Sequence, residues 1–345
     1  MGWTQRRVVV TGGASFIGSH LVEALLRAGA RVRVLDDLSS GRLSNLAAVS
    51  PDIELQVGDL RYLDFAIRAL EDCDTVFHLA AAHGGRGYIA THPADCAGNM
   101  ALDAIVFEAA LRNRIEHVTF ASSACVYPTH LQRNPVLLKE EMVSFGQRGG
   151  AFADEEYGWA KLMGELSLAA YHKQHGIGAA VARISSAYGP RENESHAVSS
   201  LIAKAAIRQS PYQIWGSGEQ TRGFTYVTDV VSGLVRAAER IQDATAVNVG
   251  SDEFIPVRRV AEEIFRIVGW SPPDGIATQP GRPVGVRHRA LDGSLARELL
   301  GWAPEMPLAK GLEASIAWYQ AYRDVTEVAE RLDTLLYERT PSSPG

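Results

Sequence analysis

The chain has 345 residues, and its 34 basic and 40 acidic side chains give a net charge of −6 at pH 7. The balance of 46% hydrophobic and 21% charged residues excludes a disordered or collagen-like chain. The acidic surplus argues against a protein that binds nucleic acid or an anionic membrane through bulk charge. The three cysteines (Cys73, Cys96 and Cys125) lack paired spacing, so we expect neither disulfides nor a metal site. With no signal peptide and no apolar run of membrane-spanning length, the sequence predicts a cytoplasmic protein.

The first half of the chain alternates short β-branched runs with stretches that carry apolar residues at helical spacing. The predicted strands are Arg7–Val10, Arg31–Leu35, Ile53–Val57, Thr75–Leu79, His117–Ala121 and Gly178–Arg183, and the predicted helices are Ser19–Ala28, Tyr62–Leu70, Ala97–Arg112 and Glu155–His175. Strand and helix alternating at this pace predict right-handed βαβ units. We therefore expect an α/β fold with a Rossmann-type, doubly wound parallel sheet.

The pattern of predicted elements changes beyond residue 190. There, Gly and Pro residues separate shorter elements, which lie between amphipathic helices such as Val257–Val268. We expect residues 1–190 to form the sheet domain, completed by a segment near 224–250. Residues 191–330 are expected to form a smaller, interleaved C-terminal α/β lobe for the substrate, and residues 331–345 a C-terminal tail.

A strand, a turn of small residues and the start of a helix follow one another near the N-terminus, as expected for a dinucleotide diphosphate site. Gly12 permits the tight turn, and Gly18 lets the helix pack on the strand. Asp36 ends the second strand, where a carboxylate accepts hydrogen bonds from ribose hydroxyls and repels a 2′-phosphate, and Asp37 adds negative charge. The pattern favours NAD over NADP; the alternative is a structural turn and a solvated aspartate.

Tyr157 and Lys161 share one face of a predicted helix, one turn apart. An ammonium about 4 Å away, at an effective dielectric of about 20, supplies roughly the 4 kcal/mol needed to lower a tyrosine pKa from about 10 toward 7. Tyr157 would then remove a hydroxyl proton while hydride leaves the same carbon. Ser123 follows a predicted strand at its carboxyl end and would hydrogen-bond the same hydroxyl, unless it is an ordinary turn serine.

These motifs, together with His78–Ala81, Tyr188–Pro190 and the stretch 216–230, resemble the extended short-chain dehydrogenase/reductase family of nucleotide-sugar epimerases and dehydratases. The resemblance implies a tightly held NAD cofactor, a nucleotide-diphosphate sugar as substrate, and a homodimer formed through Ala97–Arg112 and Glu155–His175. The cofactor-binding residues it implies are Gly12, Ser15, Phe16, Ile17, Gly18, Asp36, Asp59, Leu60, Leu79, Ala80, Ala81, Asn99, Tyr157 and Lys161. The substrate-binding residues it implies are Gly85, Arg86, Ser123, Ser186, Lys204, Gln220, Arg222 and Arg289. Of these, Arg222 and Arg289 match the family's phosphate-binding arginines, with Lys204 and Arg287 as helpers.

Within the family, stretches such as 82–87, 123–128 and 285–289 most resemble the GDP-mannose 3,5-epimerases. That resemblance implies oxidation at sugar C4 by NAD⁺, acid/base inversion beside the new ketone, and return of the hydride. It implies that Cys125 is one acid/base group. The family's second acid/base group is a lysine, and this chain has His196 at that position. Both residue types can transfer protons; the alternatives are a buried structural thiol and an exposed loop histidine. The chain departs from the family pattern at Ser15, which replaces a glycine, and at Ser186, which replaces an asparagine.

The sequence therefore predicts an NAD-dependent nucleotide-sugar epimerase that works through a transient 4-keto sugar. Tyr157, Lys161 and Ser123 are the residues for hydride transfer, and Cys125 and His196 are candidates for inversion at C3 or C5. One alternative is a 4-epimerase in which the 4-keto sugar rotates, leaving Cys125 and His196 as bystanders. Another is a non-catalytic NAD-binding relative.

Overall fold

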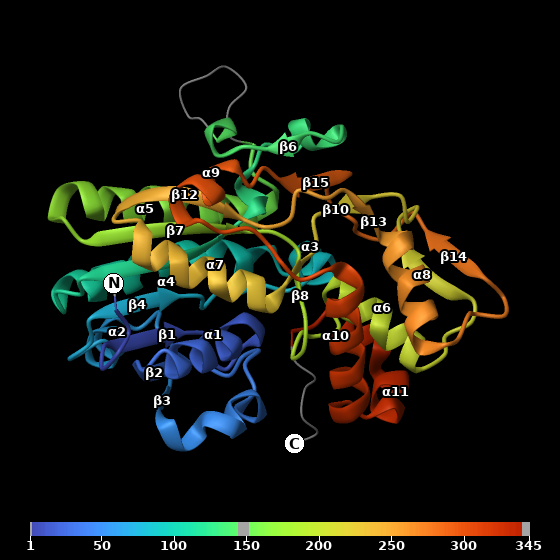
Figure 1. Ribbon diagram of the computed structural model, residues 1–345, viewed down its shortest axis with the longest axis horizontal. Coiled ribbons are helices and arrows are strands. Elements are labelled where there is room, and N and C mark those ends of the chain that lie inside the picture. The colour runs from blue at the N-terminus through green and yellow to red at the C-terminus, as the bar shows by residue number, and fades with distance from the viewer. Residues whose placement is uncertain (1, 144–151, 340–345) are drawn as a thin grey trace.

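The computed structural model describes residues 2–143 and 152–339. Its centre is a seven-stranded parallel sheet of order β12-β7-β5-β4-β1-β2-β3 (Figure 1). The strands are β1 (Arg7–Thr11), β2 (Arg31–Asp36), β3 (Ile53–Val57), β4 (Thr75–His78), β5 (His117–Ser123), β7 (Gly178–Ile184) and β12 (Asp243–Val249). The six predicted strands are all present in this sheet, so the expected doubly wound parallel fold is confirmed.

Helices cover both faces of the sheet because each central strand buries alternate side chains on opposite sides. Val8 and Val10 of β1 join the apolar cluster beneath α1 (Phe16–Arg27) and α7 (Val227–Arg240), whereas Val9 joins the cluster beneath the other helices. Those are α2 (Leu63–Ala69), α4 (Pro93–Arg112) and α5 (Glu155–His175). The predicted helices are present, with α1 and α4 beginning a few residues earlier than expected.

The second lobe is built from short strands and four helices (Figure 1). The helices are α6 (Ala197–Ala206), α8 (Val257–Val268), α10 (Leu308–Tyr322) and α11 (Val325–Leu335). Its sheets are β13 (Ile255–Pro256), β10 (Thr221–Arg222), β15 (His288–Leu291) and β6 (Leu137–Leu138); β11 (Thr225–Tyr226) with β8 (Ala187–Tyr188); and β9 (Tyr212–Trp215) with β14 (Ile276–Gln279). The chain passes between the two parts more than once, because α7 and β12 return to the large sheet.

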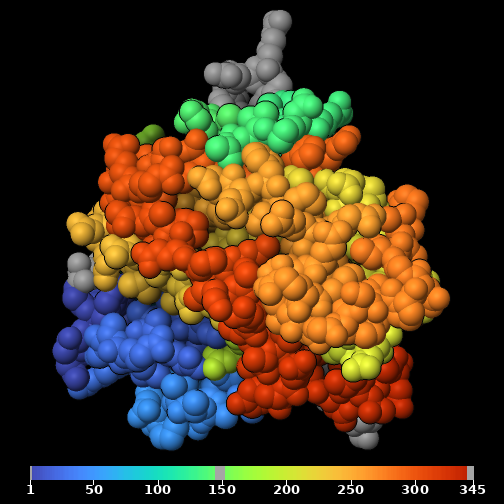
Figure 2. Space-filling model, turned by 45° about the vertical axis from the view of Figure 1, so that its right-hand side comes forward, coloured from blue at the N-terminus to red at the C-terminus, as the bar shows by residue number. Residues whose placement is uncertain are grey.

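The shorter elements are α3 (Arg86–Thr91), α9 (Ser294–Leu300) and the 3₁₀ segments η1 (Leu43–Asp52), η2 (Ala124–Val126), η3 (Thr129–Arg133) and η4 (Glu140–Met142). Helix α11 extends into the segment that the sequence suggested as a tail from residue 331. Figure 2 shows the C-terminal helices, coloured red, beside the blue N-terminal part on one face of the molecule. None of the helices in the described residues is long and apolar enough to cross a membrane.

Candidate active site

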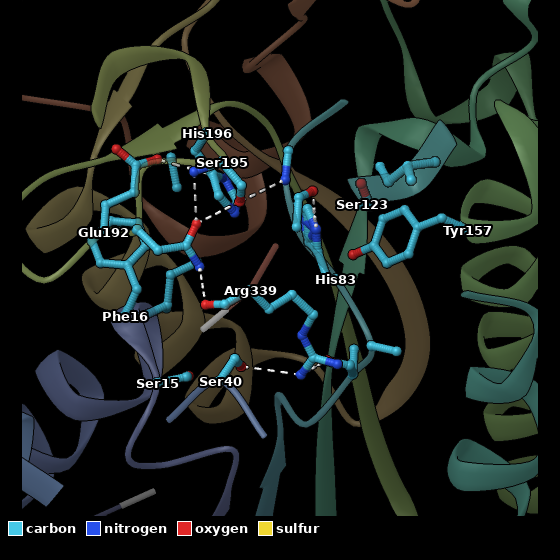
Figure 3. Close-up of a pocket in the computed structure, with 18 of the residues that line it drawn as sticks. Ser15, Phe16, Ser40, His83, Ser123, Tyr157, Glu192, Ser195, His196 and Arg339 are labelled. Carbon is cyan, nitrogen blue, oxygen red and sulfur yellow. Dashed lines mark hydrogen bonds and ion pairs between the residues drawn. The ribbon is translucent and has the colours of Figure 1, made fainter. Parts of the chain in front are cut away.

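A cavity of about 660 Å³ opens at the carboxyl ends of the large sheet's strands, bounded on its other side by the second lobe. Loops that follow β1, β2, β3, β4, β5 and β7 all line it, as expected for the ligand crevice of an open parallel sheet. Every residue predicted to bind cofactor or substrate, or to act in catalysis, lines this cavity, with the exception of Gly18. Figure 3 shows His196 on one side of the cavity and Ser123 with Tyr157 on the other.

The turn between β1 and α1 fits a dinucleotide diphosphate. Gly12 has a φ of 68°, and a Cβ there would lie 3.0 Å from the backbone of Ala80, so the position favours glycine on two counts. A Cβ at Gly18 would lie 2.1 Å from the Gly12 carbonyl oxygen, which explains why Gly18 packs the helix rather than lining the cavity. The Ser15 hydroxyl donates to that same carbonyl at 2.5 Å and does not cap α1. The N-terminal amides of α1 therefore remain available to an anion despite the replaced glycine.

A buried network joins the ends of β1 and β4 and fixes the floor of the cavity. The Thr11 hydroxyl oxygen accepts from the backbone N–H groups of Leu79 and Ala80, at 3.1 and 3.0 Å, and lies 2.8 Å from His78 Nδ1. His78 Nε2 lies 3.0 Å from the Asp103 carboxylate. The network holds the backbone from Leu79 onward along the cavity, where the sequence places part of the cofactor site.

Three of the predicted cofactor-binding residues are the polar side chains of Asp36, Asp59 and Asn99, which all line the cavity. The Asp36 carboxylate accepts from the N–H groups of Ala14 and Leu38, both at 2.9 Å, and burial raises its pKa. A carboxylate has about four lone-pair positions, so acceptor capacity for two ribose hydroxyls remains. Asp59 pairs with its neighbour Arg61 at the cavity edge. The Asn99 side chain accepts a hydrogen bond from the Ala82 N–H group and donates one to the Ala82 carbonyl, so it positions the loop after β4.

Tyr157 and Lys161 lie in the cavity wall on α5, but their electrostatic state differs from the expectation. Tyr157 is buried, and burial raises its pKa well above the usual value; the hydrogen bond with Ser123 acts in the opposite direction but is weaker. The Lys161 ammonium lies 4.6 Å above the Phe120 ring, and burial lowers its pKa although Asp103 attracts the charge. The expected lowering of the Tyr157 pKa by Lys161 is therefore wrong for the protein alone, because the loss of hydration on burial is the largest influence and acts in the opposite direction.

Cys125 is positioned directly after β5, where the Ser123 hydroxyl oxygen accepts from its N–H group at 3.1 Å. Its sulfur accepts a hydrogen bond from Arg289 Nη1 at 3.1 Å. Arg289 also donates to Asp154 at 2.6 Å and to Gln132 at 2.7 Å, and is only 7% exposed. The guanidinium expected to hold substrate phosphate is thus occupied by protein groups, and it holds the Cys125 sulfur instead. Asp154 and Gln132 were not found from the sequence, because both are distant from Arg289 in the chain.

Two other predicted cations lack a carboxylate partner among the described residues. Arg222 donates to the carbonyls of Thr221, Val284 and Arg287, and burial lowers its pKa. Lys204 donates to the Gln213 carbonyl at 3.0 Å, and burial lowers its pKa to about 8.

Arg86, by contrast, pairs with Asp154 and Glu155. Arg222 is held by carbonyl oxygens and Lys204 by a carbonyl oxygen and the Trp215 ring, so an anionic ligand would offset the burial that lowers their pKa values. Arg222 and Lys204 therefore fit a diphosphate better than Arg289 or Arg86.

His196 lines the cavity immediately before α6, and burial lowers its pKa to about 4. The sequence missed two neighbours. The His83 ring lies between the Tyr157 ring, at a centroid distance of 4.5 Å, and the His196 ring, at 5.1 Å. His83 Nδ1 donates to the Gly84 carbonyl at 2.9 Å, which leaves Nε2 with its lone pair. The Glu192 carboxyl lies 3.6 Å from His196 Nδ1, and burial raises its pKa well above the usual value.

Three remaining predicted residues shape the wall. The Gln220 amide stabilises the turn after β9, because it donates to the Trp215 carbonyl and accepts from the Gly218 N–H group. Ser186 adopts a left-handed φ of 41°, where asparagine is favoured among residues with a side chain. The N–H of Gly85 donates to the Ser195 hydroxyl at 3.1 Å, which ties α3 to the loop that carries His196.

Residues 8–250 match the NAD dependent epimerase/dehydratase family. The chain belongs to this family. It is 32% identical to a GDP-mannose 3,5-epimerase from Arabidopsis thaliana over 96% of this chain and 86% of that protein. It is 31% identical to a UDP-glucose 4-epimerase from Mycolicibacterium smegmatis over 91% of this chain and 98% of that protein.

Among solved structures, the chain resembles the UDP-glucuronic acid 4-epimerase of Bacillus cereus in complex with a UDP-sugar and NAD. The TM-score is 0.81 and the identity 26%, over 92% of this chain and all of that one. The prediction of an NAD-dependent nucleotide-sugar epimerase is confirmed at this level. The individual site residues stay predictions.

Proposed function

We propose that this protein inverts a nucleotide-diphosphate sugar at C3 or C5, through a transient 4-keto sugar. The observation that carries the proposal is the placement of two different proton-transfer groups in one cavity with Tyr157. Cys125 comes from the sheet domain, and His196 comes from the loop before α6. A 4-epimerase needs neither group.

Hydride transfer is assigned to the Tyr157 side of the cavity. Bound NAD⁺ supplies a hydride acceptor for C4. Tyr157 takes the proton of the C4 hydroxyl, Ser123 hydrogen-bonds the same oxygen, and the Lys161 ammonium stabilises the phenolate. Burial raises the pKa of Tyr157 in the protein alone, so the cationic charge that accompanies the cofactor is needed to favour the phenolate.

Inversion is assigned to Cys125, which belongs to the same side-chain cluster as Tyr157, and to the imidazoles of His83 and His196. The C4 ketone acidifies the neighbouring C–H bonds, so one group removes a proton and a second returns a proton to the opposite face. Arg289 stabilises a negative sulfur at Cys125 through its N–H donor. His196 and His83 supply neutral imidazoles, of which His83 presents the lone pair of Nε2. The diphosphate is assigned to Arg222 and Lys204.

The test is turnover in D₂O with GDP-mannose, UDP-glucose and UDP-glucuronic acid, followed by NMR of recovered substrate and product. Solvent deuterium at C3 or C5 is expected. Cys125→Ala should abolish that exchange while leaving Tyr157-dependent reduction of bound NAD⁺. Cys96→Ala is the matched control, because Cys96 is a buried thiol in the same side-chain cluster that does not line the cavity. A product without carbon-bound deuterium would refute inversion at C3 or C5.

A second candidate is 4-epimerisation, supported by the similarity to named 4-epimerases. It predicts an epimerised product at C4, with no solvent deuterium on carbon and little effect of Cys125→Ala. A non-catalytic relative would leave bound NAD⁺ oxidised with all three nucleotide sugars.

The assembly and compartment are also proposed. Four large side chains on the outer surfaces of α4 and α5 are 39–44% exposed: Met100, Trp159, Met163 and Leu166. A second copy of the chain would cover this apolar surface, which supports a homodimer. The three cysteines are free, as is usual in a reducing compartment, which supports the cytoplasm.

A further inference from the structure

The segment 336–339, which follows α11, crosses the edge of the cavity. Leu336 and Arg339 both line the cavity. The Tyr337 ring packs against Trp215 of the second lobe, with centroids 5.3 Å apart. The carbonyl of Arg339 accepts from Asn193 Nδ2 at 3.4 Å, in the loop that precedes α6. The segment is thus anchored to the second lobe while its last described side chain reaches the sheet domain.

The Arg339 guanidinium enters the cofactor side of the cavity (Figure 3). It lies 5.5 Å above the Tyr88 ring, and Nη2 donates to the hydroxyls of Ser39 and Ser40 at 3.0 and 3.1 Å. The same nitrogen reaches the Ala81 carbonyl at 3.5 Å. These partners belong to the loops after β2 and β4, which are the loops that contain the predicted cofactor residues on either side of the α1 N-terminus.

The charge of Arg339 is not neutralised by a carboxylate among the described residues, because its partners are hydroxyl and carbonyl oxygens. Its Nε is buried without a hydrogen-bond partner, as is Nη2 of Arg42, which also lines the cavity. The guanidinium acts on Asp36 through space and lowers that carboxyl's pKa, although burial has the larger, opposite effect. A guanidinium with a buried donor free of protein partners, beside a diphosphate-binding turn, is suited to an anionic acceptor.

We propose that Arg339 binds the diphosphate of the bound dinucleotide, and that segment 336–339 thereby slows the release of NAD. The α1 N-terminus contacts the diphosphate from the sheet domain, and Arg339 closes on it from the C-terminal segment. The second lobe's anchor at Trp215 holds the arginine in place. The nucleotide sugar also carries a diphosphate, but the contacts to Ser40 and Ala81 assign the arginine to the cofactor.

The experiment compares Arg339→Ala with the full-length wild type. Release of NAD from the holoenzyme is followed by trapping with an NAD-specific dehydrogenase, and affinities for ADP-ribose, adenosine and the nucleotide sugar are measured by calorimetry. Loss of one charge-assisted hydrogen bond should speed NAD release about tenfold and weaken ADP-ribose binding about tenfold. Adenosine, which has no diphosphate, should bind unchanged. The control is Arg331→Ala, which removes a cation from α11 at a position that does not line the cavity.

Unchanged NAD release with unchanged ADP-ribose affinity would overturn the proposal. Slower release would also overturn it, because the arginine would then compete with the cofactor for its site. Weaker binding of the nucleotide sugar alone would assign Arg339 to the substrate diphosphate instead. An equal loss for adenosine and ADP-ribose would indicate a general disturbance of the cavity, and would equally contradict a role in binding the diphosphate.

Discussion

Lys204 makes the affinity for the nucleotide sugar depend on pH in a way that identifies the diphosphate site. The side chain is 3% exposed, and burial, reinforced by repulsion from Arg282, lowers its pKa to about 8. A nucleotide-sugar diphosphate keeps its two negative charges throughout the neutral and alkaline range. Binding it beside Lys204 must therefore raise the lysine pKa back toward the ordinary value of about 10.4.

The sign and size of the effect follow from linkage. Below pH 7, Lys204 is charged in both free and bound protein, so the affinity is constant. Above the free pKa of about 8, the free protein must take up a proton to bind. Each further pH unit then weakens binding by up to about tenfold, or about 1.4 kcal/mol, until the bound pKa is reached.

The assay is calorimetry with the nucleotide sugar that turns over, in the Tyr157→Phe background to prevent reaction. Titrations between pH 6.5 and 9.5, in buffers of different ionisation enthalpy, report both affinity and proton uptake. Lys204→Arg should bind the sugar with a flat profile, because an arginine stays protonated in this range. Lys310→Arg is the control, since Lys310 is exposed and pairs with Glu313. A flat wild-type profile without proton uptake would refute the assignment of Lys204 to the diphosphate.

Three further outcomes are expected. Gly18→Ala should destabilise the fold by about 2 kcal/mol and reduce bound NAD, because its Cβ would meet the Gly12 carbonyl at 2.1 Å; a wild-type melting temperature would contradict this. Arg183→Met should lower the unfolding free energy in urea by about 3–5 kcal/mol, since it leaves the Glu165 carboxylate, 2.7 Å away, buried and unpaired; a loss below about 1 kcal/mol would show that Glu165 protonates at little cost. Met163→Glu on α5 should yield monomers in sedimentation, and an unchanged sedimentation coefficient would exclude this surface as the dimer interface.

The local motifs were readable because their partners are near one another in the chain. Gly12 and Gly18 lie in one strand–turn–helix unit, and Tyr157 and Lys161 lie one helical turn apart. Parallel strands place their carboxyl ends at one edge of a sheet, so the sequence also predicted that Ser123 would reach the same cavity.

The electrostatic state of the site was not readable in this way. The sequence assigned Arg289 to phosphate. In the structure its guanidinium donates hydrogen bonds to Asp154, 135 positions away, and to Cys125, 164 positions away. The sequence also predicted a lowered pKa for Tyr157. That prediction considered the attraction of the Lys161 ammonium but not the loss of hydration when the phenol is buried. His83 lies in the stretch 82–87 that resembles the GDP-mannose 3,5-epimerases, but the sequence gave it no role, and only folding places its ring between Tyr157 and His196.

The sequence by itself therefore determined the fold, the family and the cofactor, because hydrophobic period and glycine placement act over a few residues. Only the tertiary structure decided which cations remain free for an anion. Arg222, Lys204 and Arg339 have no carboxylate hydrogen-bond partner among the described residues, whereas Asp154 compensates the charge of Arg289. Neutralisation depends on which carboxylates approach through space, and burial magnifies each such contact.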